Sequence, residues 1–262
     1  MADLLKGKRG LVMGVSNERS IAWGIARTCA AEGAELAFTY QDENLLKRVG
    51  PLADSVGSDI LLPADVSDDA AMDAAFESLA ARWGQLDFLV HAIAFSDKAE
   101  LHGRFKDTSR ENFTNTLLIS CYSFIDAARR ASAMMPEGGT LLTLTFLGSR
   151  RVMPFYNTMG VAKAALESSV RYLANDLGPD GIRVNAVSPG PMKTLAGAAI
   201  GGARRTFRQS ELNSPLRANP TQEAVGGTAA FLISDYGAAT SGEIIHVDGG
   251  YHAVGMPQPE NI

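Results

Sequence analysis

The chain has 262 residues, of which 46% are hydrophobic, so it can bury a core of the size found in single-domain α/β proteins. Its formal net charge is −5 and its 24 basic residues are scattered, which argues against a nucleic-acid partner. The first ten residues lack the apolar run of a signal peptide, and no apolar run of about 18 residues indicates a membrane span, so we expect a cytoplasmic location without a membrane partner.

Short apolar runs alternate with longer segments of helical pattern along the whole chain. The runs predict strands at 9–13, 34–40, 59–63, 86–92, 139–146, 182–188 and 243–249. The segments between them predict helices, among others at 21–32, 68–83, 109–133, 155–177 and 221–234. Nearly continuous apolar strands alternating with helices are typical of a parallel sheet covered on both faces. The sequence therefore predicts an α/β, doubly wound Rossmann-type fold: one domain, 1–262, with a seven-stranded, mostly parallel sheet.

Residues at the ends of these elements refine the prediction. Thr108 and Glu111 have the spacing of a capping box at the start of the helix 109–133, and Gly178 ends the helix 155–177. A stretch rich in glycine and alanine at 195–205 indicates a segment that changes conformation at low cost, so we expect a substrate-covering loop and helix inserted at about 192–212. The proline-containing end, 256–262, is expected to fray.

The first predicted strand ends in a turn suited to a diphosphate. In MGVSNERSIAWGIA, Gly14 ends the strand and Ser20 precedes the helix. Backbone N–H groups and the positive end of the helix dipole face an anion at such a place, and small residues let it approach the backbone. The stretch lacks the three-glycine dinucleotide fingerprint, so an ordinary strand-to-helix turn is an equally good interpretation of these residues alone.

Residues after the next three strands are predicted to lie at the same edge of the sheet. Gln41 follows the second strand, where dinucleotide enzymes hold the adenosine ribose, and Asp65 follows the third, where it could accept from the adenine amino group with Val66 against the ring. Asp65 could equally be only a helix cap. Because Gln41 is neutral and no guanidinium adjoins it, the pattern favours NADH over NADPH. After the fourth strand, Ile93 between two alanines leaves room for a flat nicotinamide and its ribose.

A tyrosine and a lysine seven residues apart begin the helix predicted after the fifth strand. On an α-helix, Tyr156 and Lys163 would share one face about 10.5 Å apart along the axis. Gly160 lies between them and leaves room for a ligand. A plain surface helix is the commoner interpretation of such a pair in isolation, but the predicted nucleotide site at the same sheet edge favours catalysis. Phe146, at the end of the fifth strand, is expected to be an apolar pocket wall.

These motifs resemble those of the short-chain dehydrogenase/reductases, which carry a Tyr and a Lys on this helix and stretches like VNAVSPGPM (184–192) and VDGG (247–250). The commoner members have Tyr-x3-Lys and Thr-Gly-x3-Gly-x-Gly, which this chain lacks. Along essentially its whole length the chain is similar to the divergent branch of bacterial NADH-dependent type I enoyl-[acyl-carrier-protein] reductases. Stretches such as GVSNERSIAWGIA, HAIAFSDKAEL and PFYNTMGVAKAALE carry this resemblance.

The resemblance implies an oxidoreductase that reduces the trans-2 double bond of enoyl thioesters with NADH in type II fatty acid biosynthesis, with acyl carrier protein as its partner and a homotetramer as its assembly. It implies catalysis by Tyr156 together with Lys163. It also implies substrate contacts at Ser96, Phe146 and Tyr156, and cofactor contacts at Gly14, Ser20, Ile21, Gln41, Asp65, Val66, Ile93, Lys163, Met192, Lys193, Thr194, Leu195 and Ala196.

Two features leave alternatives open. Most type I enzymes have a tyrosine at the position of Phe146, so a specialised second enoyl reductase with altered substrate or inhibitor response is one alternative. Arg204, Arg205 and Arg208 would suit an acidic carrier protein, but a solvated helix face also explains them.

Two further alternatives concern the activity itself. They are a ketone or alcohol dehydrogenase, which the Tyr-x6-Lys spacing opposes, and a silent nucleotide-binding protein, which the presence of both residues opposes. No metal site is expected.

Overall fold

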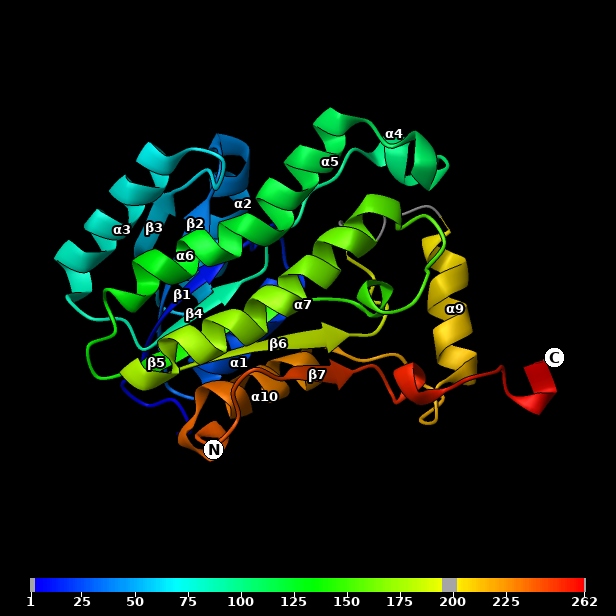
Figure 1. Ribbon diagram of the computed structural model, residues 1–262. Helices are drawn as coiled ribbons and strands as arrows, with labels where there is room; N and C mark the ends of the chain where they lie inside the picture. Colours follow the sequence, from blue (N-terminus) through cyan, green and yellow to red (C-terminus); the bar gives the residue numbers. More distant parts are fainter. Residues whose placement is uncertain (1–2, 195–201, 262) are drawn as a thin grey trace.

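A computed structural model describes residues 3–194 and 202–261 (Figure 1). Within these ranges every predicted strand is confirmed: β1 (Arg9–Met13), β2 (Glu35–Tyr40), β3 (Ile60–Pro63), β4 (Phe88–His91), β5 (Gly139–Leu144), β6 (Ile182–Pro189) and β7 (Ile244–Val247). The α-helices are α1 (Ile21–Ala31), α2 (Glu43–Ser55), α3 (Asp69–Trp83), α4 (Lys98–Leu101), α5 (Arg110–Leu117), α6 (Ser123–Ser132), α7 (Asn157–Leu177), α9 (Ala203–Asn213) and α10 (Gln222–Ile233). None of the helices described is both long and apolar enough to cross a membrane.

The strands form one parallel sheet in the order β3-β2-β1-β4-β5-β6-β7. This is the predicted doubly wound topology. The strand order reverses between β1 and β4, whose last residues, Met13 and His91, lie opposite each other in register. In open α/β sheets the crevice at the carboxyl ends of the strands beside such a reversal is where ligands bind. The topology thus places the turn after β1 and the turn after β4 on the two sides of one crevice.

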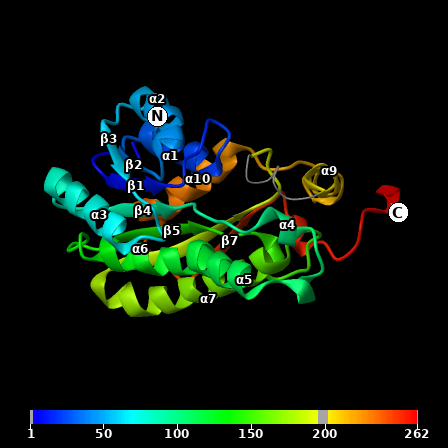
Figure 2. The ribbon, with the colours of Figure 1, turned by 90° about the horizontal axis from the view of Figure 1, so that it is seen from above.

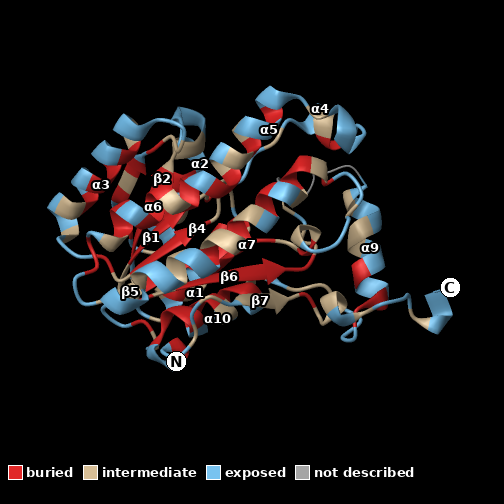
Figure 3. Cartoon of the chain, viewed as in Figure 1, coloured by how far each residue is buried: buried red, intermediate tan, exposed pale blue. Residues whose placement is uncertain are grey.

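Helices cover both faces of the sheet, as Figure 2 shows from above. One core lies between the sheet and α1, α2 and α10, and the other lies between the sheet and α3, α6 and α7. The central strands are buried and the edge strand β7 is half-buried, whereas α3, α6 and α7 expose their outer sides (Figure 3). This two-sided burial explains why the strands read as apolar runs rather than as alternating patterns.

The predicted helix 109–133 is interrupted. The chain forms α5, then a π-helical turn at Leu118–Tyr122, then α6. The hydroxyl of Ser123 donates to the Ile119 carbonyl at 2.6 Å and so competes for a group that a regular helix uses internally. The predicted cap was also one residue off, because Ser109 accepts from the N–H of Asn112, whereas Thr108 donates to the Phe105 carbonyl.

Residues 256–261, the part of the tail that the structure describes, are hydrogen-bonded to the rest of the protein rather than frayed as predicted. Asn213, the last residue of α9, accepts at its side-chain oxygen from the N–H of Gln258 at 2.8 Å, and Asn261 donates to the Leu212 carbonyl at 3.1 Å. Figure 1 shows the red C-terminal segment beside the yellow α9 helix. The tail is therefore hydrogen-bonded to α9.

Candidate active site

A cavity of about 1200 Å³ opens at the crevice between the two halves of the sheet. Its walls come from the segments after β1, β4, β5 and β6, the start of α7 and the start of α9. Many of the predicted site residues line it: Gly14, Ser20, Ile21, Ile93, Phe146, Tyr156, Lys163, Met192, Lys193 and Thr194. The fold therefore gathers into one cavity residues that lie as much as 180 positions apart, from Gly14 to Thr194.

The turn after β1 leaves no room for a side chain at its first residue. Gly14 has a φ of +96°, and a Cβ on it would lie 2.2 Å from the carbonyl oxygen of Ala92. The pairing of Met13 with His91 brings these two strand ends together. Ser20 is buried at the start of α1 and donates to the Asn17 carbonyl at 2.7 Å, which closes the turn. A bare backbone before a helix N-terminus on a cavity wall fits a diphosphate group.

The predicted adenosine residues lie at the same sheet edge but are not among the residues lining the cavity. Gln41, after β2, donates to the Asp65 carboxylate after β3 at 3.0 Å. Asp65 also accepts from the N–H and hydroxyl of Ser67, and these bonds and the one from Gln41 lower its pKa. Val66 packs against the core beneath. The structure thus joins Gln41 to Asp65, and their contact with adenosine stays a prediction.

Buried polar residues of α5, the π turn and α6 hold the segment 91–97, which carries Ile93 and Ser96. The bonds are Asn112 Oδ1 to Asp97 N at 2.9 Å, Thr116 Oγ1 to Ser96 Oγ at 2.9 Å, Ser120 Oγ to Phe95 N and O at 3.0 Å each, and Ser123 Oγ to His91 Nε2 at 2.8 Å. Ser96 is occupied by this contact and does not line the cavity, so its substrate contact stays a prediction.

Tyr156 is the N-cap residue of α7, so the helix begins two residues later than the predicted 155, and the Tyr156 carbonyl accepts from the Gly160 N–H at 3.2 Å. The turn is unusual because Phe155 and Asn157 adopt positive φ values of 59° and 31°. Asn157 holds it by donating to the carbonyls of Glu100, Leu101 and Gly103 at 2.9–3.3 Å. A bulky residue in the left-handed region is strained, and such strain persists only where surrounding contacts impose it.

The phenol of Tyr156 is buried, with 6% of the residue exposed. Burial, and secondarily the charge of Glu167, raises its pKa. The hydroxyl therefore keeps its proton at neutral pH and is available as a donor. Its ring meets the Phe146 ring edge-on, with centroids 5.1 Å apart. Phe146 lines the cavity, which confirms its predicted place in an apolar wall.

Lys163 is buried on the same cavity wall and donates to the Leu144 carbonyl at 2.8 Å. Burial lowers the pKa of its ammonium to about 8, while Cys121 and Glu167 act in the opposite direction. A cation with one protein acceptor has further N–H donors to offer. His91, deeper in the sheet, is neutral because burial and the charge of Lys163 lower its pKa to about 3.

The segment after β6 completes the wall. Leu195 and Ala196 of the predicted cofactor set lie outside the described residues, as does much of the predicted covering loop. The helix expected there is α9, and Arg204 and Arg205 at its start line the cavity. Lys98 and His102, beside α4, also line it and were not predicted. Lys98 belongs to the stretch HAIAFSDKAEL and His102 directly follows it, but no pattern in the sequence marked either as a cavity residue.

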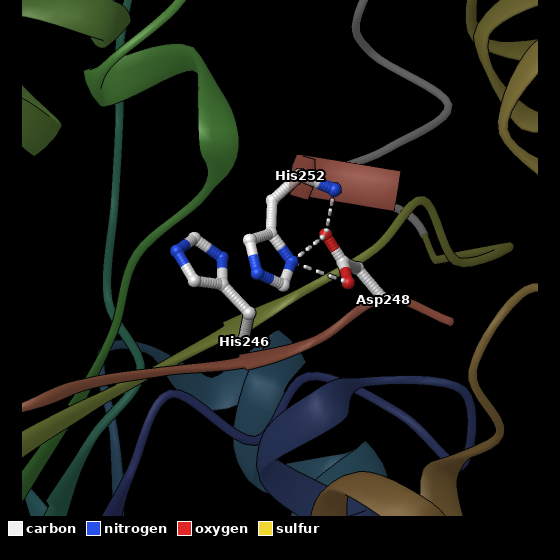
Figure 4. Close-up of side chains that lie close together, drawn as sticks. All are labelled: His246, Asp248 and His252. Carbon is white, nitrogen blue, oxygen red and sulfur yellow. Dashed lines mark hydrogen bonds and ion pairs between the residues drawn. The ribbon is translucent and has the colours of Figure 1, made fainter. Parts of the chain in front are cut away.

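A separate cluster lies at the end of β7, where His246, Asp248 and His252 approach one another (Figure 4). His252 Nδ1 bonds both Asp248 oxygens, at 3.0 and 3.1 Å, and the histidine rings stack with centroids 4.0 Å apart and planes 11° apart. Because imidazole lone pairs lie in the ring planes, two parallel rings do not converge on one ion. The carboxylate instead orders the VDGG turn, and a Cβ on Gly190 would lie 3.1 Å from Asp248.

A doubly wound parallel sheet with a large cavity at its reversal point, a bare glycine turn and a buried tyrosine and lysine defines a dinucleotide-dependent oxidoreductase. The family profile described as "Enoyl-(Acyl carrier protein) reductase" matches residues 14–252. The chain belongs to this enoyl reductase family.

Individual relatives with high sequence identity belong to the same family. The chain is 59% identical over 260 residues to enoyl-[acyl-carrier-protein] reductase [NADH] 2 of Rhizobium meliloti, covering 99% of this chain and 97% of that one. It is 52% identical to a crystal structure of the reductase from Anaplasma phagocytophilum in complex with NAD, with a TM-score of 0.96 and 98% of each chain covered. FabI from Candidatus Liberibacter asiaticus gives 52% identity and a TM-score of 0.97, covering 98% of this chain and 100% of that one.

Proposed function

We propose that this chain uses NADH to reduce the trans-2 double bond of enoyl thioesters carried by acyl carrier protein, in fatty acid biosynthesis. The observation that carries the proposal is that the buried Tyr156 and the buried Lys163 line one cavity, at the reversal point of the sheet. The similarity to reductases named for NADH and for acyl carrier protein supports the same reaction. The cytoplasmic location stays a prediction.

Tyr156 is the proposed catalytic donor. NADH, when bound, supplies the hydride that the β-carbon of the enoyl thioester accepts. Negative charge then develops on the thioester carbonyl oxygen, and a donor already positioned in a site with little water stabilises that charge. Tyr156 meets both conditions, because it is buried and its raised pKa keeps the proton on the hydroxyl.

Lys163 is proposed to hold the nicotinamide ribose hydroxyls and to place a positive charge near the developing enolate. Gly14, Ser20 and Ile21 form the wall that would hold the diphosphate. Gln41 presents a neutral side chain where a 2′-phosphate would need a guanidinium, which supports NADH rather than NADPH.

Residues 192–212, including α9, are proposed to cover the substrate. Two parts of this stretch line the cavity. They are Met192, Lys193 and Thr194 at its start, and Arg204 and Arg205 in the first turn of α9. Lys193 lies over the Phe207 ring of α9 with its ammonium 4.9 Å from the centroid, so the segment after β6 contacts α9.

One spectrophotometric assay tests the proposal. NADH oxidation is followed with crotonyl or longer enoyl thioesters and, in parallel, with an acetoacetyl thioester. Oxidation with the enoyl substrates is expected. Oxidation with the acetoacetyl thioester alone would identify a ketone reductase instead, and no oxidation with either would identify a silent nucleotide-binding protein.

Phe146→Tyr is expected to change the KM for the enoyl thioester, or the affinity for phenolic inhibitors, by about 2- to 10-fold, as one gained or displaced hydrogen bond does. The kcat should change less, because the Tyr156 hydroxyl already serves the carbonyl oxygen. Steady-state kinetics on both proteins measures this. A large rise in kcat would show that a second hydroxyl takes part in the chemistry.

The arginines of α9 are proposed to dock the acidic carrier protein. Replacing Arg204, Arg205 and Arg208 together with alanine is expected to raise the KM for carrier-bound enoyl substrate about tenfold, with a smaller effect in high salt. The KM for a small uncharged enoyl thioester should stay the same. Arg208 does not line the cavity, so Arg208→Ala alone tests docking without changing the cavity wall. An equal rise in KM for both substrates would show that the arginines act within the cavity rather than in docking.

The homotetramer stays a prediction that rests on apolar side chains exposed along α5, the π turn and α7. These are Phe113, Leu118, Tyr122, Val161 and Tyr172. Exposed apolar side chains gathered on neighbouring helices mark contact surfaces. Sedimentation velocity at micromolar concentration distinguishes a tetramer from smaller species.

A further inference from the structure

Glu167 is a buried carboxylate on α7, one helical turn beyond Lys163. Its side chain is 5% exposed. The carboxylate accepts from Thr145 Oγ1 at 2.9 Å, from Arg150 Nε at 3.0 Å and from the Ser149 hydroxyl in a short contact. All three donors lie in the segment 145–150, which leads from β5 toward the turn before α7. A buried charge is tolerated only when such bonds satisfy it.

The same segment forms the support beneath the Tyr156 ring. Phe146 meets that ring edge-on. A Cβ on Gly148 would lie 2.4 Å from Tyr156 Cδ1, so the ring rests against bare backbone. A Cβ on Gly160 of α7 would lie 2.8 Å from the Gly148 carbonyl oxygen and 3.5 Å from Tyr156 Cδ1, so Gly160 packs closely against both. The direction of the phenol therefore depends on where the segment 145–150 is held.

We infer that Glu167 is a positioning residue for the reduction: it fixes the segment 145–150, and through it the Tyr156 phenol, and it sets the charge beside Lys163. The reaction itself is the one proposed above. Glu167 does not line the cavity and so acts through its neighbours. Since the segment's three donors converge on one carboxylate, loss of its charge weakens the whole connection between α7 and the support of Tyr156.

The electrostatics support this role. Burial raises the pKa of Tyr156 and lowers the pKa of Lys163, and the charge of Glu167 acts in the raising direction on both. The other ionisable group acting on Lys163 is the Cys121 thiol, whose own pKa burial raises, while His91 is neutral at working pH. Arg150 carries the opposing charge, but half of its side chain is exposed to solvent. The buried Glu167 carboxylate, one helical turn from Lys163, thus favours the ammonium form of that lysine.

Glu167→Gln tests the inference because glutamine keeps the size and one acceptor but not the charge. The kcat for enoyl reduction is expected to fall about tenfold through misplacement of Tyr156, with the KM for NADH little changed. In the nucleotide-free protein the pKa of Lys163, followed by NMR of 13C-dimethylated lysines, should fall. The alkaline limb of the rate profile should move to lower pH. Glu167→Asp should restore the pKa of Lys163 but only part of kcat.

Two matched variants separate positioning from stability. Thr145→Val removes one donor and keeps the carboxylate, so kcat should fall with the pKa of Lys163 unchanged. It also tests the inference if Glu167→Gln fails to fold. Arg150→Ala removes only the exposed partner and should have the smaller effect on kcat. The inference is overturned if Glu167→Gln changes the melting temperature but neither kcat nor the pKa of Lys163. A wild-type protein inactive on enoyl thioesters would refute the proposed function instead, and the lysine titration would still test the charge.

Discussion

Tyr156→Phe is expected to lower kcat for an enoyl thioester by about 10²- to 10³-fold, the loss measured when one preorganised oxyanion donor is removed. The ring would keep its contacts with Phe146 and Gly148, so the wall of the cavity should be preserved. The affinity for NADH should change little, because the hydroxyl is proposed to act on the substrate. Steady-state kinetics and nucleotide titration on the same preparation measure both quantities.

Tyr122→Phe is the matched control for this substitution. Tyr122 belongs to the π turn, is half exposed and does not line the cavity, so losing its hydroxyl should leave kcat unchanged. A double variant, Phe146→Tyr with Tyr156→Phe, asks whether a hydroxyl on the neighbouring ring can replace the missing one. A near-normal kcat for Tyr156→Phe alone would show that Tyr156 is not the oxyanion donor, and the proposed mechanism would be wrong.

Local patterns predicted the fold because both faces of the sheet are covered. The strands are then mostly apolar, and each predicted run corresponds to one observed strand. The carboxyl ends of parallel strands meet at one edge of the sheet, and this rule also predicted that residues as far apart as Gly14 and Lys163 would line one cavity. The prediction failed where a side chain competes with the helix backbone. The bond from Ser123 to the Ile119 carbonyl accompanies a π turn within an otherwise helical pattern.

Tertiary contacts explain what the sequence did not reveal about the site. Tyr156 lies outside the helix because Asn157 binds carbonyls beside α4, more than 50 residues away in the chain. The three bonds to Glu167 likewise span 17 to 22 residues and follow no periodicity. The Tyr-x6-Lys spacing therefore runs from the N-cap of α7 into the helix. It puts Lys163 within α7 and Tyr156 on the turn before it.

Lys163→Met is expected to raise the Kd for NADH by roughly 10- to 100-fold, the range for hydrogen bonds made by a charged group. Methionine fills a similar volume and removes the charge and the donors. Fluorescence titration of the nucleotide measures the change. Lys47→Met on exposed α2 is the matched control and should leave the Kd as it is. An unchanged Kd for Lys163→Met would mean that Lys163 does not hold the nucleotide.

The pH dependence gives the same substitution a second test. Burial lowers the pKa of Lys163 to about 8, so its positive charge is lost as the pH rises through that value. Since kcat/KM for NADH reports groups of the free enzyme, this ratio should fall above pH 8 in the wild type, and this limb should be absent in Lys163→Met.

The contribution of Lys163 to folding stability should rise with pH, whereas kcat/KM for NADH should fall. Between the folded pKa near 8 and the ordinary value of 10.5, the unfolded chain binds more protons at this lysine, so the contribution of Lys163 to folding stability rises with pH. The melting temperature of the nucleotide-free Lys163→Met protein, relative to the wild type, should therefore change little below pH 8 and decrease from pH 8 to pH 10. A constant difference would show that the folded protein holds this lysine with an ordinary pKa, and the alkaline limb would then need another group.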